Sequence, residues 1–400
     1  MSAALPTESG PRARLTSLTG VRFIAAFMVF MFHAGLVQLF DNRSIGDTFL
    51  RIFSKTGWIG VSFFFVLSGF VLTWSARSND TAPAFWRRRF AKILPNHLVT
   101  FVVALVLFAS VATPVTTQLL NFALLHAWVP DVNVYFSLNK ANWSLACESV
   151  FYLLFPFLHA RLLKIRTERL WWWAGGLMAV IMALPALALA VLPAEPTLPA
   201  PDDPAPAAVY WFLYVLPPVR VLDFLLGMVL ARIVLTGRWA GFRVLPLTLL
   251  FVACYVVSLQ LPASFGLGAA TIVPVALLIP AVAQLDVSGR PSLLRHPVAV
   301  WLGEISFAFY LTQWLVLPGA MSVLGTEGDT YPTWAAVGLL VLWLAVSLLL
   351  SWALYVGVER PAMRRFSRGR RSRAAAARKS TVEYADAGPG SRPNDPAGRC

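Results

Sequence analysis

The chain has 400 residues, of which 58% are hydrophobic and only 13% are charged, and its mean hydropathy is +0.67. A soluble protein of this size would expose far more charge, so the composition excludes an ordinary soluble enzyme and indicates a polytopic membrane protein. The net charge of +14 does not indicate nucleic acid, because the basic residues fall in short loops and in the last forty residues rather than on one face. Cys147, Cys254 and Cys400 have neither disulfide nor metal spacing.

Ten apolar runs approach the length that crosses a bilayer, which predicts an all-α bundle of about ten transmembrane helices. The runs are 18–39, 58–76, 96–113, 143–160, 170–192, 209–235, 243–261, 266–285, 299–319 and 334–358. The loops rich in Lys and Arg are 77–95, 161–169, 232–243 and 286–298, and the alternate loops are poor in them. The positive-inside rule therefore predicts that both termini lie in the cytoplasm.

Three stretches depart from regular spans. Pro217-Pro218 predicts a break in the sixth run, followed by Arg220 and Asp223 one turn apart beside a cavity. Residues 119–128 are expected to form a short interfacial segment, and the Pro-rich loop 193–208 is expected to be an external linker without regular structure.

The chain is expected to divide into three parts. Residues 1–14 should form a cytoplasmic N-terminal segment, residues 15–366 the membrane domain, and residues 367–400 a disordered basic cytoplasmic tail.

The first span carries two ionisable residues, Arg22 and His33, in an otherwise apolar run. Their spacing is close to a whole number of turns, so both side chains lie on one helix face, about 16 Å apart along the axis. The predicted topology puts Arg22 near the cytoplasmic surface and His33 in the outer half of the bilayer. An ionisable group at that depth usually faces a polar cavity, and a histidine there is a candidate proton acceptor.

Glu148 lies just inside the fourth span, which is predicted to enter from the outer side at Trp143. This places the carboxylate at a depth similar to that of His33, where it would favour a charged imidazole and hold the ring. A structural ion pair that only joins two helices fits the same spacing. The sequence leaves both interpretations open.

Two further patterns are ambiguous. Arg89 and Lys92 would share a helix face and could bind the phosphates of a cytoplasmic donor, although a basic cluster also serves as a topology signal. Small residues at positions 60, 62, 68 and 69 of the second span favour close helix packing.

The chain resembles the acyltransferase family 3 integral membrane proteins over about residues 15–366. Seven motifs in order carry this resemblance: Arg22 with His33; Phe-Phe-x-Leu-Ser-Gly-Phe at 64–70; Arg89 and Lys92 with Pro95; Trp143-Ser144-Leu145 with Glu148; Arg220 with Leu226-Gly227; Ile305-Ser306-Phe307 with Tyr310-Leu311; and Val358-Glu359-Arg360-Pro361. Two positions depart from the family pattern: Lys92 stands where Arg is frequent, and Gln313-Trp314 stands where a histidine commonly follows the Tyr-Leu pair.

The resemblance implies an O-acyltransferase of the cytoplasmic membrane. His33 would be the catalytic base, Glu148 an active-site residue, and Arg22, Arg89 and Lys92 the donor-binding residues. The donor would be an acyl-CoA such as acetyl-CoA. We further expect Ser68 to assist His33, and we expect that no metal is required.

The acceptor would be a hydroxyl of a carbohydrate or of a secondary metabolite. The short external loops favour a small lipophilic acceptor, such as a macrolide, over a polymer. Two other classes remain open. A secondary transporter would also show a broken helix and intramembrane charges, but in repeated halves, and a non-catalytic scaffold would need none of the Arg, His and Glu arrangement.

Overall fold

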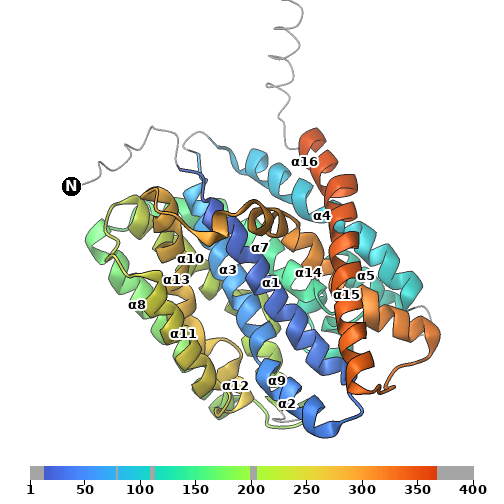
Figure 1. Ribbon diagram of the computed structural model, residues 1–400. Helices are drawn as coiled ribbons and strands as arrows, with labels where there is room; N and C mark the ends of the chain where they lie inside the picture. The colour runs from blue at the N-terminus through green and yellow to red at the C-terminus, as the bar shows by residue number, and fades with distance from the viewer. Residues whose placement is uncertain (1–12, 78–79, 109–112, 199–204, 367–400) are drawn as a thin grey trace, which may run out of the picture.

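The computed structural model describes residues 13–77, 80–108, 113–198 and 205–366, and these residues are mostly helical (Figure 1). The predicted tail 367–400 and most of the predicted segment 1–14 lie outside the described residues. The longer helices are α1 Thr16–Val37, α2 Arg43–Phe53, α3 Thr56–Trp74, α4 Ala82–Leu107, α5 Val115–Phe122, α7 Asn142–Leu162, α8 Leu170–Val191, α10 Pro217–Leu235, α11 Val244–Ser258, α13 Ile272–Val287, α14 Pro297–Leu324 and α15 Thr333–Leu354.

Short elements connect these helices. They are η1 His126–Trp128, α6 Val132–Tyr135, η2 Thr167–Arg169, α9 Ala207–Tyr210, η3 Trp211–Val215, α12 Ala263–Gly266, η4 Ala269–Thr271, η5 Leu293–Arg295, η6 Tyr355–Glu359 and α16 Arg360–Phe366. Two strands, β1 Thr197–Leu198 and β2 Ala205–Pro206, pair antiparallel.

Eight helices in the described part of the chain are long and apolar enough to cross a membrane. They are Thr16–Val37, Arg43–Trp74, Ala82–Leu107, Asn142–Leu162, Thr167–Val191, Ala269–Val287, Pro297–Leu324 and Thr333–Phe366. The two remaining predicted spans correspond to α10, which carries Arg220, Asp223 and Arg232, and to α11, which has only 15 residues. The prediction of an all-α polytopic bundle is confirmed.

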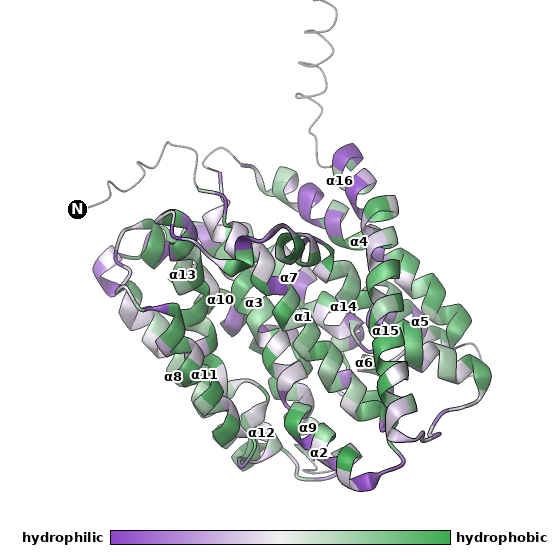
Figure 2. Ribbon diagram, viewed as in Figure 1, coloured by the Kyte–Doolittle hydropathy of each residue, from purple (hydrophilic) through white to green (hydrophobic). Residues whose placement is uncertain are grey.

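Hydrophilic residues gather where α16 and the first half of α4 lie, whereas hydrophobic residues cover the sides of the helices (Figure 2). Polar contacts join the segments that are predicted to face the cytoplasm. Arg238 of loop 232–243 pairs with Glu168 of loop 161–169 at 3.0 Å, and the backbone N–H of Ser17, at the start of α1, donates to Asp286 of loop 286–298 at 2.8 Å. The beginning of α1 and the end of α16 lie at the same end of the bundle (Figure 1). The side of the membrane that this end faces stays a prediction.

The helix α4 begins much earlier than the sequence indicated. The sequence predicts a basic loop over residues 77–95 and a span that starts at residue 96, yet α4 begins at Ala82 and continues through Pro95. Charge keeps a segment out of hydrocarbon but does not prevent it from being helical, so the basic residues extend the span beyond the lipid. This places Arg89 and Lys92 on one helix face, as predicted.

The predicted break in the sixth run is confirmed. The short helix α9 continues into the π-helical turn η3, Leu216 is extended with ψ 116°, and α10 starts at Pro217. Proline fits the first position of a helix because its missing N–H would have no intrahelical partner there. Inside α10, Arg220 and Asp223 form a buried ion pair at 2.6 Å.

One loop expectation needs correction. The segment 193–208 is not without regular structure, because Thr197 pairs with Pro206 and Leu198 with Ala205 before α9 begins at Ala207. Segments flanked by proline are already extended, so two of them can pair over a short distance. Residues 119–128 belong to two pieces, the end of α5 and the short η1.

Close backbone contact joins α3 to α10. A Cβ atom on Gly69 would lie 1.9 Å from the carbonyl oxygen of Phe224, and one on Gly227 would lie 1.9 Å from that of Val66. A Cβ on Gly60 would lie 2.7 Å from the carbonyl oxygen of Ala25 on α1. The expected small-residue packing is therefore confirmed at these glycines, because no larger side chain fits between the helices.

Candidate functional site

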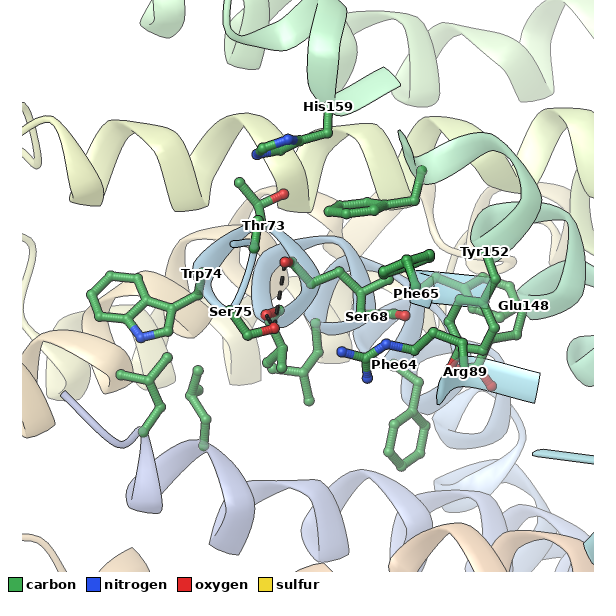
Figure 3. Close-up of a pocket in the computed structure, with 18 of the residues that line it drawn as sticks. Phe64, Phe65, Ser68, Thr73, Trp74, Ser75, Arg89, Glu148, Tyr152 and His159 are labelled. Atoms are coloured by element: carbon green, nitrogen blue, oxygen red, sulfur yellow. Dashed lines mark hydrogen bonds between the residues drawn. The ribbon is translucent and has the colours of Figure 1, made fainter. Parts of the chain in front are cut away.

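A cavity of about 1830 Å³ opens between α1, α3, α4, α7 and α14. Arg89, Glu148, Tyr152 and Ser68 lie together on one side of it, and Trp74 lies on the other (Figure 3). The cavity is larger than the 300–1,000 Å³ typical of a small-molecule site, so it has room for an extended ligand.

Several cations line the cavity, and three of them are the residues that the resemblance assigns to the donor. Arg22 comes from α1, and Arg89 and Lys92 come from α4, which is helical at this point. The Arg89 guanidinium lies 5.5 Å from the centre of the Phe85 ring, and Lys92 Nζ lies 5.7 Å from that of Phe307. The structure therefore brings together the three residues that the sequence assigned to the donor.

None of these three cations has an ion-pair partner within 4.0 Å in the described part of the chain, and Arg89 Nε is buried without a hydrogen bond. Their neighbour Arg88 is different, because it pairs with Asp80. Unpaired charges in a partly buried site are costly, so the arrangement is suited to an anionic ligand.

Glu148 lies in the same cavity and is held from its own helix. The Tyr152 hydroxyl donates to Glu148 Oε1 at 2.5 Å, and the Trp86 indole donates to the Tyr152 carbonyl oxygen at 3.0 Å. Tyr152 was not predicted from the sequence. Its position four residues after Glu148 was the available signal, because side chains at i and i+4 meet on a helix.

His33 does not line this cavity. It is buried, with 7% of its surface exposed, and its ring lies 4.9 Å from that of Trp314. Lys140 lies close enough for its charge to influence the imidazole, and the Gln313 side chain lies within hydrogen-bonding reach of it. His33 Nδ1 is buried without a hydrogen bond. Gln313 and Trp314 thus surround His33 at the positions that depart from the family pattern.

The expected pair of His33 and Glu148 is not formed. The prediction assumed that the fourth span begins at the membrane surface, but Asn139, Asn142 and Trp143 are all buried. Residues on both sides of Lys140 therefore already pack inside the bundle, and the exposed Lys140, rather than Glu148, lies on the Trp314 ring that packs against His33. Glu148 lies about two turns further along, among the cations and Tyr152.

Ser68 and Cys147 lie away from His33. Ser68 lines the cavity on the side of Arg89 and Glu148 (Figure 3), so it lies with the donor residues and not with His33. Cys147 is buried, with its sulfur 3.4 Å from the carbonyl oxygen of Val215. Among the residues that the structure describes, no group of three His, Cys, Asp or Glu side chains could hold a metal ion.

Sequence comparisons with known proteins support the resemblance that the motifs indicate. The family model described as "Acyltransferase domain" matches residues 15–356. The acyltransferase MdmB of Streptomyces mycarofaciens is 41% identical over 367 residues, which cover 89% of this chain and 94% of that protein. The peptidoglycan O-acetyltransferase OatA of Listeria monocytogenes is 30% identical over 164 residues, 36% of this chain and 24% of that protein. No solved structure matches the chain.

The matched region begins just before α1, ends at the second residue of η6, and includes most of the cavity lining, Arg22, Arg89, Lys92 and His33. The chain therefore belongs to the acyltransferase-3 family and is a membrane acyltransferase.

Proposed function

We propose that this protein is an O-acyltransferase of the cytoplasmic membrane that moves an acetyl or short acyl group from acyl-CoA to a hydroxyl. The acceptor is a carbohydrate or a macrolide-like secondary metabolite. The observation that carries the proposal is the convergence of Arg22, Arg89 and Lys92 on one large cavity without carboxylate partners among the described residues.

The three cations bind the phosphates of the donor. Arg22 and Arg89 offer planar, bidentate donors to phosphate oxygens, whereas Lys92 acts as a point charge. The predicted orientation places this end of the bundle in the cytoplasm, where acyl-CoA is made. The volume of about 1830 Å³ leaves room for the nucleotide and for the extended arm that ends in the thioester.

His33 is the general base. It takes the proton of the acceptor hydroxyl while the hydroxyl oxygen bonds to the thioester carbonyl carbon; the carbon–sulfur bond then breaks, and the thiolate of CoA leaves and takes up the proton. The unpartnered Nδ1 of the buried imidazole supports this assignment, because neighbouring groups do not occupy that nitrogen.

Glu148 and Ser68 act on the donor side of the reaction. Since Glu148 is held by Tyr152 and does not contact His33, we assign it to orienting the donor arm, whose amide N–H groups can donate to a carboxylate. The hydroxyl of Ser68 lines the same cavity and can donate to the thioester carbonyl oxygen as negative charge develops there.

The relative OatA is named a peptidoglycan O-acetyltransferase, which supports acetyl transfer to a hydroxyl as the chemistry of this chain. The match to MdmB covers nearly the whole of both chains and supports the acyltransferase activity in general.

A direct test uses the purified protein in lipid nanodiscs with acetyl-CoA labelled in the acetyl group. Sugar and macrolide acceptors are offered separately, and both free CoA thiol and labelled ester are measured. We expect release of thiol and formation of ester only when a suitable acceptor is present. If no acceptor yields ester, and proteoliposomes instead move an unmodified acceptor across the bilayer, the protein is a transporter and the proposal is wrong.

A further inference from the structure

The cavity ends about one helical turn before the residues around His33. On α7 the lining stops at Ser144, whereas Lys140, whose Nζ lies 4.6 Å from the centre of the Trp314 ring, is in the turn just before this helix. On α14 the lining stops at Tyr310 and Leu311, whereas Trp314 packs against His33 one turn later. One turn corresponds to about 5 Å along the axis, so along α14 the cavity ends close to the residue that packs against His33.

A hydrogen-bonded clasp joins α14 to the start of α7 at this end of the cavity. Tyr310 Oη lies 2.8 Å from Ser144 Oγ and donates to the Ala141 carbonyl oxygen at 3.3 Å. Ser144 Oγ lies 2.9 Å from the same carbonyl oxygen, and the Phe64 ring meets the Tyr310 ring edge-on at 6.1 Å. Tyr310 and Ser144 are 9% and 7% exposed, so the clasp is closed to bulk solvent.

We propose that Tyr310, clasped by Ser144, is the barrier between the donor cavity and His33 and determines which acyl groups reach His33. This inference rests on the proposed function. The acceptor oxygen must approach the thioester carbonyl carbon to about 3–3.5 Å while it is hydrogen-bonded to the base. Because the cations hold the donor on one side of Tyr310 and His33 lies on the other, the acyl carbon must reach the level of the Tyr310 ring.

The clasp can open at small cost. Each of its hydrogen bonds contributes about 1 kcal/mol, so a rotation of the Tyr310 side chain is accessible during turnover. An acetyl group needs only a small displacement of the ring, whereas each added methylene meets the Tyr310 ring and Phe64. The barrier therefore selects short acyl groups, and it also keeps water near His33 away from the thioester.

The experiment compares acetyl-, propionyl- and butyryl-CoA with Tyr310→Phe, which keeps the ring and removes the clasp. We expect the ratio of kcat/KM for butyryl-CoA to that for acetyl-CoA to rise at least about tenfold, because butyryl is two methylenes longer and one methylene in a tight pocket already has about this effect. Hydrolysis of acyl-CoA without acceptor should also rise, while KM for acetyl-CoA stays unchanged because the cations are untouched. Ser144→Ala should shift both readouts in the same direction, and Tyr310→Trp should lower the butyryl ratio.

The matched control is Thr312→Val on the same helix, which removes a buried hydroxyl that contacts Ser351, 2.9 Å away, and does not line the cavity. It should leave the chain-length ratio and the hydrolysis at wild-type values. The barrier is overturned if Tyr310→Phe and Ser144→Ala transfer acetyl groups with the wild-type ratio and wild-type hydrolysis. A wild-type protein that consumes none of the three donors overturns the proposed function itself, so the two failures are distinguishable.

Discussion

The Tyr152 hydroxyl donates a hydrogen bond of 2.5 Å to the Glu148 carboxylate, inside a cavity that also holds Arg22, Arg89 and Lys92. This bond fixes the carboxylate at i to a phenol at i+4 on α7. It also occupies one carboxylate oxygen and restrains the Glu148 side chain, which lines the cavity.

Replacing Tyr152 with Phe should weaken donor binding without stopping the chemistry. Loss of a hydrogen bond to a charged group costs about 1.5–3 kcal/mol, so we expect KM for acetyl-CoA to rise about tenfold or more while kcat changes little. Steady-state kinetics of thiol release measure both constants. A fall in kcat at unchanged KM would show that Tyr152 acts on the reaction and not on the donor.

Replacing His33 with Ala should abolish transfer in a folded protein. Loss of a positioned base lowers kcat by about 10² to 10⁴, and the cations that hold the donor remain in place. The measurement is transfer of labelled acetyl groups, with CoA binding and size-exclusion elution as evidence of folding. Transfer at the wild-type rate by this variant would exclude His33 as the base.

Replacing Gly69 with Ala should destabilise the bundle, because the new Cβ would lie 1.9 Å from the Phe224 carbonyl oxygen and force α3 and α10 apart. Overpacking of this kind costs about 1–3 kcal/mol. Thermal unfolding in detergent, followed by intrinsic fluorescence, should show a lower midpoint. Gly175→Ala on α8 is the matched control, since its Cβ would meet no atom within 4 Å. Equal midpoints for the two variants would contradict the close packing.

Hydropathy was sufficient to predict most of the fold. Most of the apolar runs correspond to helices, many of them with ends that agree to within a few residues, and Pro217-Pro218 marks the break before α10. Hydropathy does not predict the start of α4, because a charged segment between two apolar runs has the pattern of a loop. Charge reports whether a segment lies in lipid, and it does not report whether the backbone is helical.

The sequence predicts which site residues share a face of a single helix. It does not predict which residues of different helices lie at the same depth in the bundle. Arg89 and Lys92 share a face of α4 by spacing alone, and Arg22 reaches the same cavity from α1. The pairing of His33 with Glu148 required the depth at which α7 begins. That depth is set by the buried residues before it, such as Asn139, which donates to the Leu311 carbonyl oxygen at 2.8 Å. A tertiary contact of this kind leaves no periodic signal in the sequence.

Direct binding of CoA to the purified protein tests the central claim, that the basic cavity is the donor site. The triple variant Arg22→Gln, Arg89→Gln and Lys92→Gln removes the three unpaired cations, and Arg87→Gln removes an exposed cation of the same basic cluster that does not line the cavity. Titration calorimetry should give a Kd that rises at least about 100-fold in the triple variant, with a weaker dependence on salt, and a Kd near the wild-type value in Arg87→Gln. If the triple variant binds CoA with the wild-type Kd and salt dependence, the cavity is not the donor site.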